Sequence, residues 1–225
     1  MTAAVNNKVG PNEMYGHSCQ TYLTERVNYR PLSVLKEDAA IVEAFHRRAF
    51  DQAYKAYDAR IVHKRTWNSL LVQLRKASMA HSQALLVSNF YTALSTHESI
   101  SSDLRKVLWL LFRLFAYHTM DNEARQFSQA KAVSDTDLDA IADEVQSLME
   151  QIRPHAVNLV DAWSVPDYLL DSALGRYDGQ VYEDLFERAH RLNPLNEVTF
   201  NPNWKTEEIV MGGGTADIDR IVAKL

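Results

Sequence analysis

The sequence predicts an all-α protein built as a helical bundle, and three observations support that prediction. Only seven glycines and six prolines occur in 225 residues, which favours long helices over a fold rich in turns. Apolar residues recur at helical spacing along most of the sequence, and no stretch shows the strict alternation of a β-strand. The composition, 46% hydrophobic and 24% charged, is ordinary for a globular protein and excludes wholesale disorder.

The first expected elements lie in the N-terminal half. Residues 1–36 carry scattered glycine, proline and polar residues without sustained periodicity, so we expect an irregular lead-in or linker there. An acidic pair then opens a helix expected over 37–63, because acidic side chains favour a helix N-terminus. Thr66 is the expected N-cap of a second long helix that runs to Leu94.

The middle of the sequence predicts the centre of the bundle. Ser101 precedes a stretch, 104–115, that is so apolar that we expect its helix to be buried on most sides. The pattern allows a short helix over 121–130. Ser134 then begins an amphipathic helix expected over 134–152.

Prolines divide the C-terminal third into shorter helices. Pro154 should kink or break the preceding helix, and the pattern continues helically over 155–162 until Pro166. We expect one short helix over 167–174 and another over 180–191. A short polar turn therefore separates the last two of these helices.

That turn is Gly175-Arg176-Tyr177-Asp178-Gly179, and its glycines permit a positive φ or a close approach to a partner. One interpretation is structural: Arg176 and Asp178 satisfy backbone groups at the two helix ends. The other is a loop that faces a phosphate or nucleotide, since Gly179 opens a helix whose N–H groups would face an anion. No Walker or Rossmann spacing supports the second, so the pattern alone favours the first.

Charge and cysteine content narrow the classes of function. The formal net charge of −5 and the pI near 5.9 give no long-range attraction to nucleic acid or to an anionic membrane. Cys19 is the sole cysteine, so the chain cannot form an intrachain disulfide or a thiolate metal site. The eight histidines are scattered without metal-ligand spacing, and we expect no metal site.

Other functional signals are weak. We expect no membrane span, because the longest apolar run, Val107–Ala116, is interrupted by Arg113. The N-terminus lacks the apolar region of a secretory signal, and no nucleophile motif is present. A solvated helix face is a better interpretation than a phosphate contact for the two basic triplets, His46-Arg47-Arg48 and His63-Lys64-Arg65.

Several ordered stretches point to one protein family. The upstream ones are Ala44-Phe45-His46-Arg47-Arg48-Ala49 and Leu74-Arg75-Lys76-Ala77-Ser78-Met79-Ala80-His81. The downstream ones are Ile152-Arg153-Pro154, Val160-Asp161-Ala162, Ser172-Ala173-Leu174-Gly175-Arg176-Tyr177-Asp178-Gly179, Val181-Tyr182-Glu183, Leu185-Phe186 and Pro194-Leu195-Asn196. They resemble the C-terminal helical domain of peroxisomal acyl-CoA oxidases, and the resemblance covers about residues 37–205. It implies a helical bundle of the acyl-CoA oxidase C-terminal type.

The resemblance also implies a reaction for the full enzyme. These oxidases use FAD to take a hydride from the β-carbon of an acyl-CoA while a glutamate takes the α-proton, and dioxygen then becomes hydrogen peroxide. This is the first step of fatty-acid β-oxidation. In these enzymes the flavin domains and that glutamate precede the matched region. The resemblance therefore implies that this chain carries no catalytic residue. It also implies that FAD is held by the full enzyme and not by this chain alone.

In such enzymes the C-terminal domain packs on the catalytic half, contributes to a homodimer and helps to close the flavin region. The resemblance therefore implies the catalytic half or a full-length oxidase as partner, with acyl-CoA as the substrate of the full enzyme. The residues it singles out for flavin or nucleotide contact are Arg176, Tyr177, Asp178, Gly179, Tyr182 and Glu183.

The tail, residues 206–225, completes the sequence with a short helix expected over 215–222. Its last residues, Ala223-Lys224-Leu225, resemble the C-terminal peroxisomal address, which predicts an import receptor as partner and the peroxisome as location. An alternative function is a stand-alone, non-catalytic helical module that dimerises with itself or with a full-length oxidase. An unrelated helical scaffold is the third possibility, and it would require the ordered matches to be chance.

Overall fold

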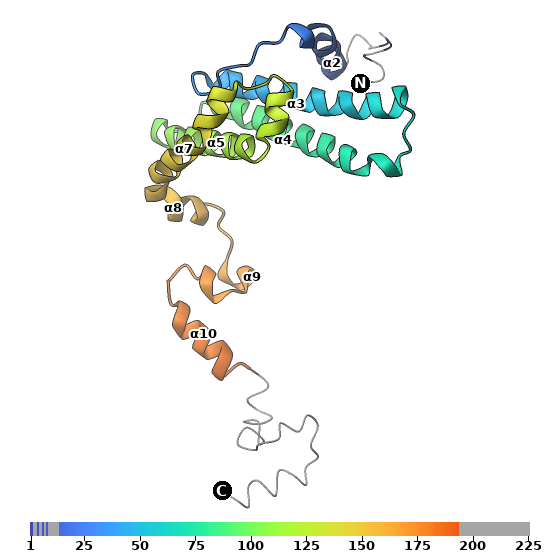
Figure 1. Ribbon diagram of the computed structural model, residues 1–225. Coiled ribbons are helices and arrows are strands. Elements are labelled where there is room, and N and C mark those ends of the chain that lie inside the picture. Colours follow the sequence, from blue (N-terminus) through green and yellow to red (C-terminus); the bar gives the residue numbers. More distant parts are fainter. Residues whose placement is uncertain (2–3, 5, 7, 9–13, 194–225) are drawn as a thin grey trace, which may run out of the picture. The chain divides into compact units, whose positions relative to one another are not determined.

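The fold is helical, as the sequence predicts. The computed structural model describes residues 14–193 together with Met1, Ala4, Asn6 and Lys8 (Figure 1). Apart from one isolated β-bridge, the regular structure of these residues consists of helices and helical turns. The chain separates into two compact units, Met1–Ala156 and Val157–Leu225.

The first unit is a bundle in which α3 packs along α4, and α5 packs along α7 (Figure 1). Its helices are α2 Met14–Glu25, α3 Asp38–Tyr57, α4 Leu71–Thr96, α5 Ser102–Asn122, α6 Ala124–Gln129 and α7 Asp135–Ile152. Its short turns are the 3-10 turns Arg26–Asn28, Asn68–Leu70 and Arg153–His155, and the π-helical turn Asp58–Val62 that follows α3. The helices expected from residue 37 to residue 152 are therefore confirmed, although α5 extends beyond its expected apolar stretch.

One hydrophobic core holds this unit together. Phe45 of α3, Phe112 of α5 and Phe127 of α6 are fully buried. The Phe45 and Phe127 rings meet edge to face, with centroids 5.1 Å apart, and the Phe90 and Phe112 rings do the same at 5.7 Å. Edge-to-face contact suits the aromatic quadrupoles, so the rings contribute more than their buried area alone. Ile141 of α7 belongs to the same buried cluster.

Serine caps begin two helices at the positions that the sequence predicts. The Ser101 hydroxyl accepts a hydrogen bond from the Leu104 backbone N–H at 3.4 Å, at the start of α5. The Ser134 hydroxyl accepts one from the Asp137 backbone N–H at 3.1 Å, at the start of α7. Each cap satisfies a helix N–H that has no partner within the helix.

The expectation of an irregular lead-in over 1–36 is wrong for α2, which occupies the middle of that segment. On α2, Cys19 and Tyr22 are buried. The Tyr22 ring lies 5.8 Å from the Phe50 ring of α3, and its hydroxyl donates to the Asp51 carboxylate at 3.3 Å. The sequence gives little sign of this helix because its packing surface is supplied by α3, almost thirty positions away along the chain.

A second part of the lead-in, residues 30–36, packs against the bundle, and we call it the strap; it ends in a turn at 34–36. Leu32 forms an isolated parallel bridge with Val133, in which the Leu32 N–H donates to the Ala132 carbonyl at 3.3 Å. The Tyr117 hydroxyl of α5 donates to the Val34 carbonyl at 3.1 Å, and Val34 itself is fully buried. The strap is thus tied to the bundle by backbone groups that a search for helical periodicity does not detect.

The expectation that the apolar stretch of α5 is buried on most sides is also wrong. Phe112, Ala116 and Met120 are fully buried on one face, whereas the side chains of Leu104 and Phe115 are 48% and 36% exposed. The reason is geometric, since α4 and α7 cover only part of the helix. Among the described residues, no helix is long and apolar enough to cross a bilayer.

Candidate functional site

The second unit carries the turn that the sequence singles out. Its helical elements are α8 Ala156–Asp161, which begins at the last residue of the first unit, α9 Asp167–Leu170, the 3-10 turn Ala173–Gly175 and α10 Val181–His190. The helix expected over 167–174 is wrong in its second half, because α9 ends at Leu170 and Asp171 takes a left-handed φ of 43°. Aspartate tolerates this conformation better than most residues, and the Asp171 carboxylate accepts from Arg188 of α10 at 2.8 Å.

Arg176 and Asp178 close the turn on itself. The Arg176 Nε donates to Asp178 Oδ1 at 2.9 Å, and its Nη2 donates to Oδ2. Asp178 Oδ1 also accepts from the Gln180 backbone N–H at 3.0 Å, just before α10 begins. The guanidinium and then this N–H lower the pKa of the Asp178 carboxyl from 3.8 to about 2. Asp178 thus satisfies a backbone group at a helix start, as the structural interpretation of the turn expects.

The ion pair continues into α10. Arg176 Nη1 lies 3.7 Å from Asp184 Oδ1, and Asp184 Oδ2 accepts from Arg188 Nε at 2.8 Å. Arg188 also pairs with Asp171, so three carboxylates share two guanidinium groups. Asp178 thus already engages the Nε and Nη2 donors of Arg176, and the surplus of negative charge disfavours an anion at this place.

The two glycines of the turn have different roles. Gly179 has a φ of +74°, a conformation that favours glycine, and a Cβ there would meet nothing within 4 Å. A Cβ on Gly175 would lie 3.0 Å from Leu170 Cδ1, so this glycine permits the turn to approach α9 closely. The two uses of glycine that the sequence suggested, a positive φ and a close approach, are thus divided between the two positions.

The remaining candidates are exposed. The side chains of Tyr177 and Tyr182 are 81% and 83% exposed, and Glu183 is exposed on the first turn of α10. The structure therefore brings Arg176, Asp178 and the Gly179 backbone together, but it does not gather all six candidates around one point. A role in flavin contact remains a prediction for each of them.

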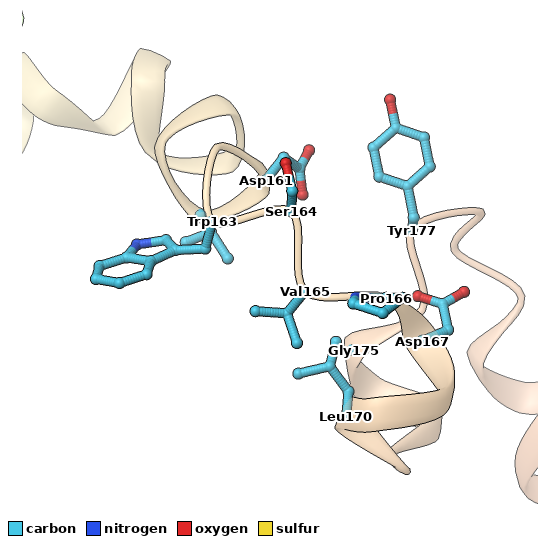
Figure 2. Close-up of a pocket in the computed structure, with 10 residues that line it drawn as sticks. Asp161, Trp163, Ser164, Val165, Pro166, Asp167, Leu170, Gly175 and Tyr177 are labelled. Carbon is cyan, nitrogen blue, oxygen red and sulfur yellow. The ribbon is translucent and has the colours of Figure 1, made fainter.

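A cleft of about 680 Å³ lies beside the turn (Figure 2). Tyr177 and Trp163 lie on opposite sides of it, and Pro166, Leu170 and Gly175 lie between them in this view. Trp163 and Leu170 are not among the site residues that the sequence predicts. The available signal was the clustering of large apolar residues from Trp163 to Leu170, which is unusual in a segment too short to form a core.

The second unit buries little of its own apolar surface. Among its described residues, 157–193, Ala173 is the one buried apolar residue. The large apolar residues that it exposes are Val157, Val160, Trp163, Val165, Tyr168, Leu169, Leu170, Leu174, Tyr177, Tyr182, Leu185, Phe186 and Leu192. Burial of apolar surface is the main driving force of folding, so the described part of this unit contributes little core of its own.

The two basic triplets differ from one another. His63-Lys64-Arg65 is exposed, in agreement with a solvated face. That interpretation is wrong for the first triplet, because Arg48 is only 1% exposed and Arg47 pairs with Glu43 at 2.9 Å while stacking on the Tyr29 ring. Across the described part of the chain, no group of three or more histidine, cysteine or acidic residues is arranged to hold a metal ion.

Comparison with known proteins gives one consistent result. The family model described as acyl-CoA oxidase matches residues 37–208. Peroxisomal acyl-coenzyme A oxidase 1 of Bos taurus is 31% identical over 173 residues, which cover 74% of this chain and 26% of that protein. Arabidopsis thaliana acyl-CoA oxidase 1 has a similar structure, with a TM-score of 0.76, 27% identity, and coverage of 93% of this chain and 32% of that one.

A further solved structure is similar over the same part of the chain. Acyl-CoA oxidase-1 of Caenorhabditis elegans, complexed with FAD and ATP, has a TM-score of 0.70 and 27% identity, with coverage of 90% of this chain and 31% of that one. This chain thus spans between a quarter and a third of the length of these relatives. The extent of the matches, in sequence and in fold, shows that the chain belongs to the acyl-CoA oxidase family.

Proposed function

We propose that this chain forms the C-terminal helical part of a peroxisomal acyl-CoA oxidase, an enzyme that converts acyl-CoA and dioxygen to trans-2-enoyl-CoA and hydrogen peroxide. Family membership and the peroxisomal names of relatives support the proposal. In this proposal the catalytic base and most of the flavin site belong to the larger part of the oxidase, because the chain spans 26% of its bovine relative. The role of the chain itself is to complete the fold and the dimer.

The observation that carries this proposal is the apolar surface of the second unit. Ala173 is the one buried apolar residue among residues 157–193, so this described segment has almost no core of its own. Trp163 is 81% exposed and Tyr182 is 83% exposed, and exposed aromatic side chains of this size are typical anchors of protein interfaces. We propose that the flavin-bearing part of the oxidase covers them.

The turn residues fit only part of an FAD molecule. The exposed Tyr177 ring beside an apolar cleft can stack on or pack against a flavin or adenine ring. The FAD pyrophosphate does not fit here, because Arg176 is already paired with Asp178 and Asp184. FAD supplies the hydride acceptor of the reaction when it is bound. The contribution that we propose for Tyr177, Gly179 and Tyr182 is to hold a ring and exclude water, with Arg176 and Asp178 keeping the turn in shape.

Homodimer formation, closure of the flavin region and import into the peroxisome belong to the same proposal. The targeting tripeptide, Ala223-Lys224-Leu225, lies outside the described residues, as does the short helix expected over 215–222. The relatives named peroxisomal support the location. The limits of the domain, 37–205, also stay a prediction.

The proposal is tested by purifying the 225-residue chain alone and adding the flavin-bearing part of an acyl-CoA oxidase from the same organism. We expect the chain alone to be colourless near 450 nm and to produce no hydrogen peroxide from acyl-CoA. We expect it to bind the added part and to raise peroxide production. A chain that alone holds flavin and oxidises acyl-CoA would overturn the proposal, as would a chain that neither binds the added part nor changes its activity.

A matched pair of variants locates the surface. Trp163→Ser removes an exposed aromatic residue from the second unit, and Trp67→Ser removes one that is 58% exposed from the first. We expect the first variant to weaken binding to the flavin-bearing part at least tenfold and the second to change it little. The reverse order would place the interface on the first unit. A self-associated chain that binds only a full-length oxidase would favour the stand-alone module instead.

A further inference from the structure

The connection between α3 and α4, residues 58–72, protrudes at one end of the bundle, and we call it the hairpin tip. It consists of the π-helical turn Asp58–Val62, the loop 63–67, the 3-10 turn Asn68–Leu70 and the first two residues of α4. Figure 1 shows it at the end of the α3–α4 pair, away from α5 and α7. Its turns pack chiefly against the two helices that they join. The other described helices of the first unit therefore leave the hairpin tip uncovered.

Large apolar side chains are concentrated on the hairpin tip. Nine consecutive residues, 61–69, are exposed. The exposed large apolar residues of the tip are Ile61, Val62, Trp67, Leu71 and Val72. The least exposed of them, Ile61, is 49% exposed, and the most exposed, Val72, is 70% exposed. Exposed apolar residues that occur singly need no explanation, but five within twelve positions indicate a surface that contacts something apolar.

The same segment carries only positive charge beyond its first residue. Between Asp58 and Glu98 the sequence contains no acidic residue, and Asp58 itself lies 3.2 Å from His63 in an ion-pair geometry. The lysines and arginines in this interval are Arg60, Lys64, Arg65, Arg75 and Lys76. The whole chain has a net charge of −5, so the local field at the hairpin tip differs in sign from the average.

Hydrogen bonds order the loop without neutralising its charges. The Arg60 Nη1 donates to the Arg65 carbonyl at 2.8 Å, and the Arg60 guanidinium lies 4.9 Å from the centre of the Trp67 ring. The Arg65 Nη2 donates to the Ser69 carbonyl at 2.9 Å. In the part of the chain that the structure describes, no carboxylate forms an ion pair with Arg60, Lys64 or Arg65. The tip thus presents ordered cations beside ordered apolar side chains.

Two features of the hairpin tip favour a lipid bilayer over a protein as its partner. Apolar side chains beside lysine and arginine suit a surface with an apolar interior and anionic headgroups. Tryptophan is enriched at that boundary because its ring is apolar and its N–H is polar. A narrow protrusion provides little of the roughly 800 Å² per partner that a specific protein interface buries. Entry of a small apolar surface to a depth of about 5–10 Å is enough at a bilayer.

We infer that the hairpin tip binds the surface of a membrane that contains anionic lipids. Trp67 and the aliphatic residues of the tip enter the boundary between headgroups and acyl chains, and Lys64 and Arg65 contact the headgroups. The net charge of −5 gives the whole chain no long-range attraction, so the local field acts only within about one Debye length, roughly 8 Å at physiological salt. The inference concerns the first unit and does not depend on the proposed function.

The test is co-sedimentation of the full chain with sucrose-loaded vesicles. One set contains phosphatidylcholine and phosphatidylserine in a ratio of two to one, and the reference set contains phosphatidylcholine alone. We expect at least tenfold tighter binding to the anionic vesicles, and weaker binding as salt is added, because each cation near an anionic surface strengthens binding by about fivefold. Absence of binding, or equal binding to both sets, would overturn the inference.

A matched pair of apolar variants locates the contact. Val62→Ser with Trp67→Ser changes the hairpin tip, and Val160→Ser with Trp163→Ser removes the same two residue types from the second unit, where both are exposed. We expect the tip variant to lose at least tenfold in affinity for anionic vesicles and the second-unit variant to lose less than twofold. Equal losses, or a larger loss in the second-unit variant, would place the contact elsewhere and refute the inference.

A matched pair of charge variants tests the headgroup contact. Lys64→Gln with Arg65→Gln removes two cations of the tip, and Arg30→Gln with Lys36→Gln removes two exposed cations of the strap. Both change the net charge equally, so a difference between them reflects position. We expect at least a tenfold loss in the tip variant and less than a threefold loss in the strap variant, whereas equal losses would show only diffuse attraction and would contradict the inference. Circular dichroism ensures that each variant is folded.

Quenching of tryptophan fluorescence by brominated phosphatidylcholine in the anionic vesicles tests insertion directly. Trp67→Phe keeps an aromatic anchor but removes the fluorophore, so we expect most of the quenching to disappear while binding remains. We expect Trp163→Phe to retain the quenching. Unchanged quenching in Trp67→Phe would show that the tip does not enter the bilayer. A chain that does not bind vesicles, but loses binding to the flavin-bearing part in the Val62→Ser, Trp67→Ser variant, would identify a protein interface and also overturn the inference.

Discussion

Truncation of Phe112 to alanine should destabilise the first unit far more than truncation of Phe115, three positions further along α5. Phe112 is 0% exposed, and its ring centroid lies 5.3 Å from that of Trp109 and 5.7 Å from that of Phe90. Removing a fully buried phenylalanine side chain costs about 3–5 kcal/mol, because the lost transfer free energy is increased by an enclosed cavity. Phe112→Ala should therefore lower the free energy of unfolding by about 4 kcal/mol.

Phe115 is the internal control because it is 36% exposed. Its truncation removes about two thirds of a transfer term of roughly 2–3 kcal/mol and opens no enclosed cavity, so about 1–2 kcal/mol is expected. The gain in helix propensity on changing phenylalanine to alanine is the same at both positions and cancels in the comparison. The two variants should thus differ by about 2–3 kcal/mol.

Urea unfolding followed by far-ultraviolet circular dichroism measures both free energies. In thermal scans, Phe112→Ala should lower the melting temperature by about 8–16 °C, from about 2–4 °C per kcal/mol for a unit of this size. The measurement should be repeated across protein concentrations, since self-association would protect exposed positions. Equal losses for the two variants at low concentration would refute the one-sided burial of α5.

The remaining predictions concern single positions. Gly179→Ala should destabilise the turn by about 1–2 kcal/mol, because its φ of +74° strains any other residue, and we expect weaker binding to the flavin-bearing part that we propose as partner. Gly175→Ala should have a smaller effect, since the Leu170 side chain that it meets at 3.0 Å is flexible. Ser134→Ala should cost about 1 kcal/mol in urea unfolding through loss of the cap of α7. The Asp178 carboxyl should titrate near pH 2 in a carbon-13 NMR titration. Because its folded pKa lies below 3.8, its ion pair favours the folded turn above that pH and the benefit is lost as the pH falls through about 2. Arg176→Gln should move the titration towards 3.8, and an unchanged midpoint would show that the pair does not form in solution.

Most helices of the first unit are predictable from the sequence, because their caps and their apolar spacing are set by residues within or next to each helix. Ser101 and Ser134 act as caps at the positions where the sequence places them. Apolar spacing in α3 and α7 coincides with the faces that are buried. The bundle architecture follows because amphipathic helices of this length must pack against one another.

Features that depend on distant partners are not predictable in this way. Tyr22 is buried only because α3 provides Phe50, and Arg48 is buried only because two glutamines and Glu123 receive its hydrogen bonds and charge. The residues that neighbour Tyr22 and Arg48 in the sequence do not indicate these partners. The apolar stretch of α5 predicts more burial than the structure shows, because an apolar sequence does not indicate which sides of its helix other helices will cover.

The candidate site also combines features that the sequence predicts with features that it does not. The glycine positions suggested a turn, and Gly179 indeed takes a positive φ. The pairing of Arg176 with Asp184 depends on how α10 folds back towards the turn, and the cleft beside Trp163 depends on where α9 ends. Both features depend on the three-dimensional arrangement of the helices. The sequence therefore indicates where the candidate segment lies in the chain, but not how its side chains are arranged in space.

The strap of residues 30–36 bears on where an autonomously folding segment begins. The family model begins at residue 37, just after the strap. Asp137 of α7 is 9% exposed, and its carboxylate accepts from the Leu35 backbone N–H at 3.4 Å. A chain that starts at residue 37 would leave this carboxylate and the Tyr117 hydroxyl without their strap partners, and would uncover the surface that Val34 seals. The start of the family model therefore falls inside the physical unit, and expression of the bundle should start upstream of the strap.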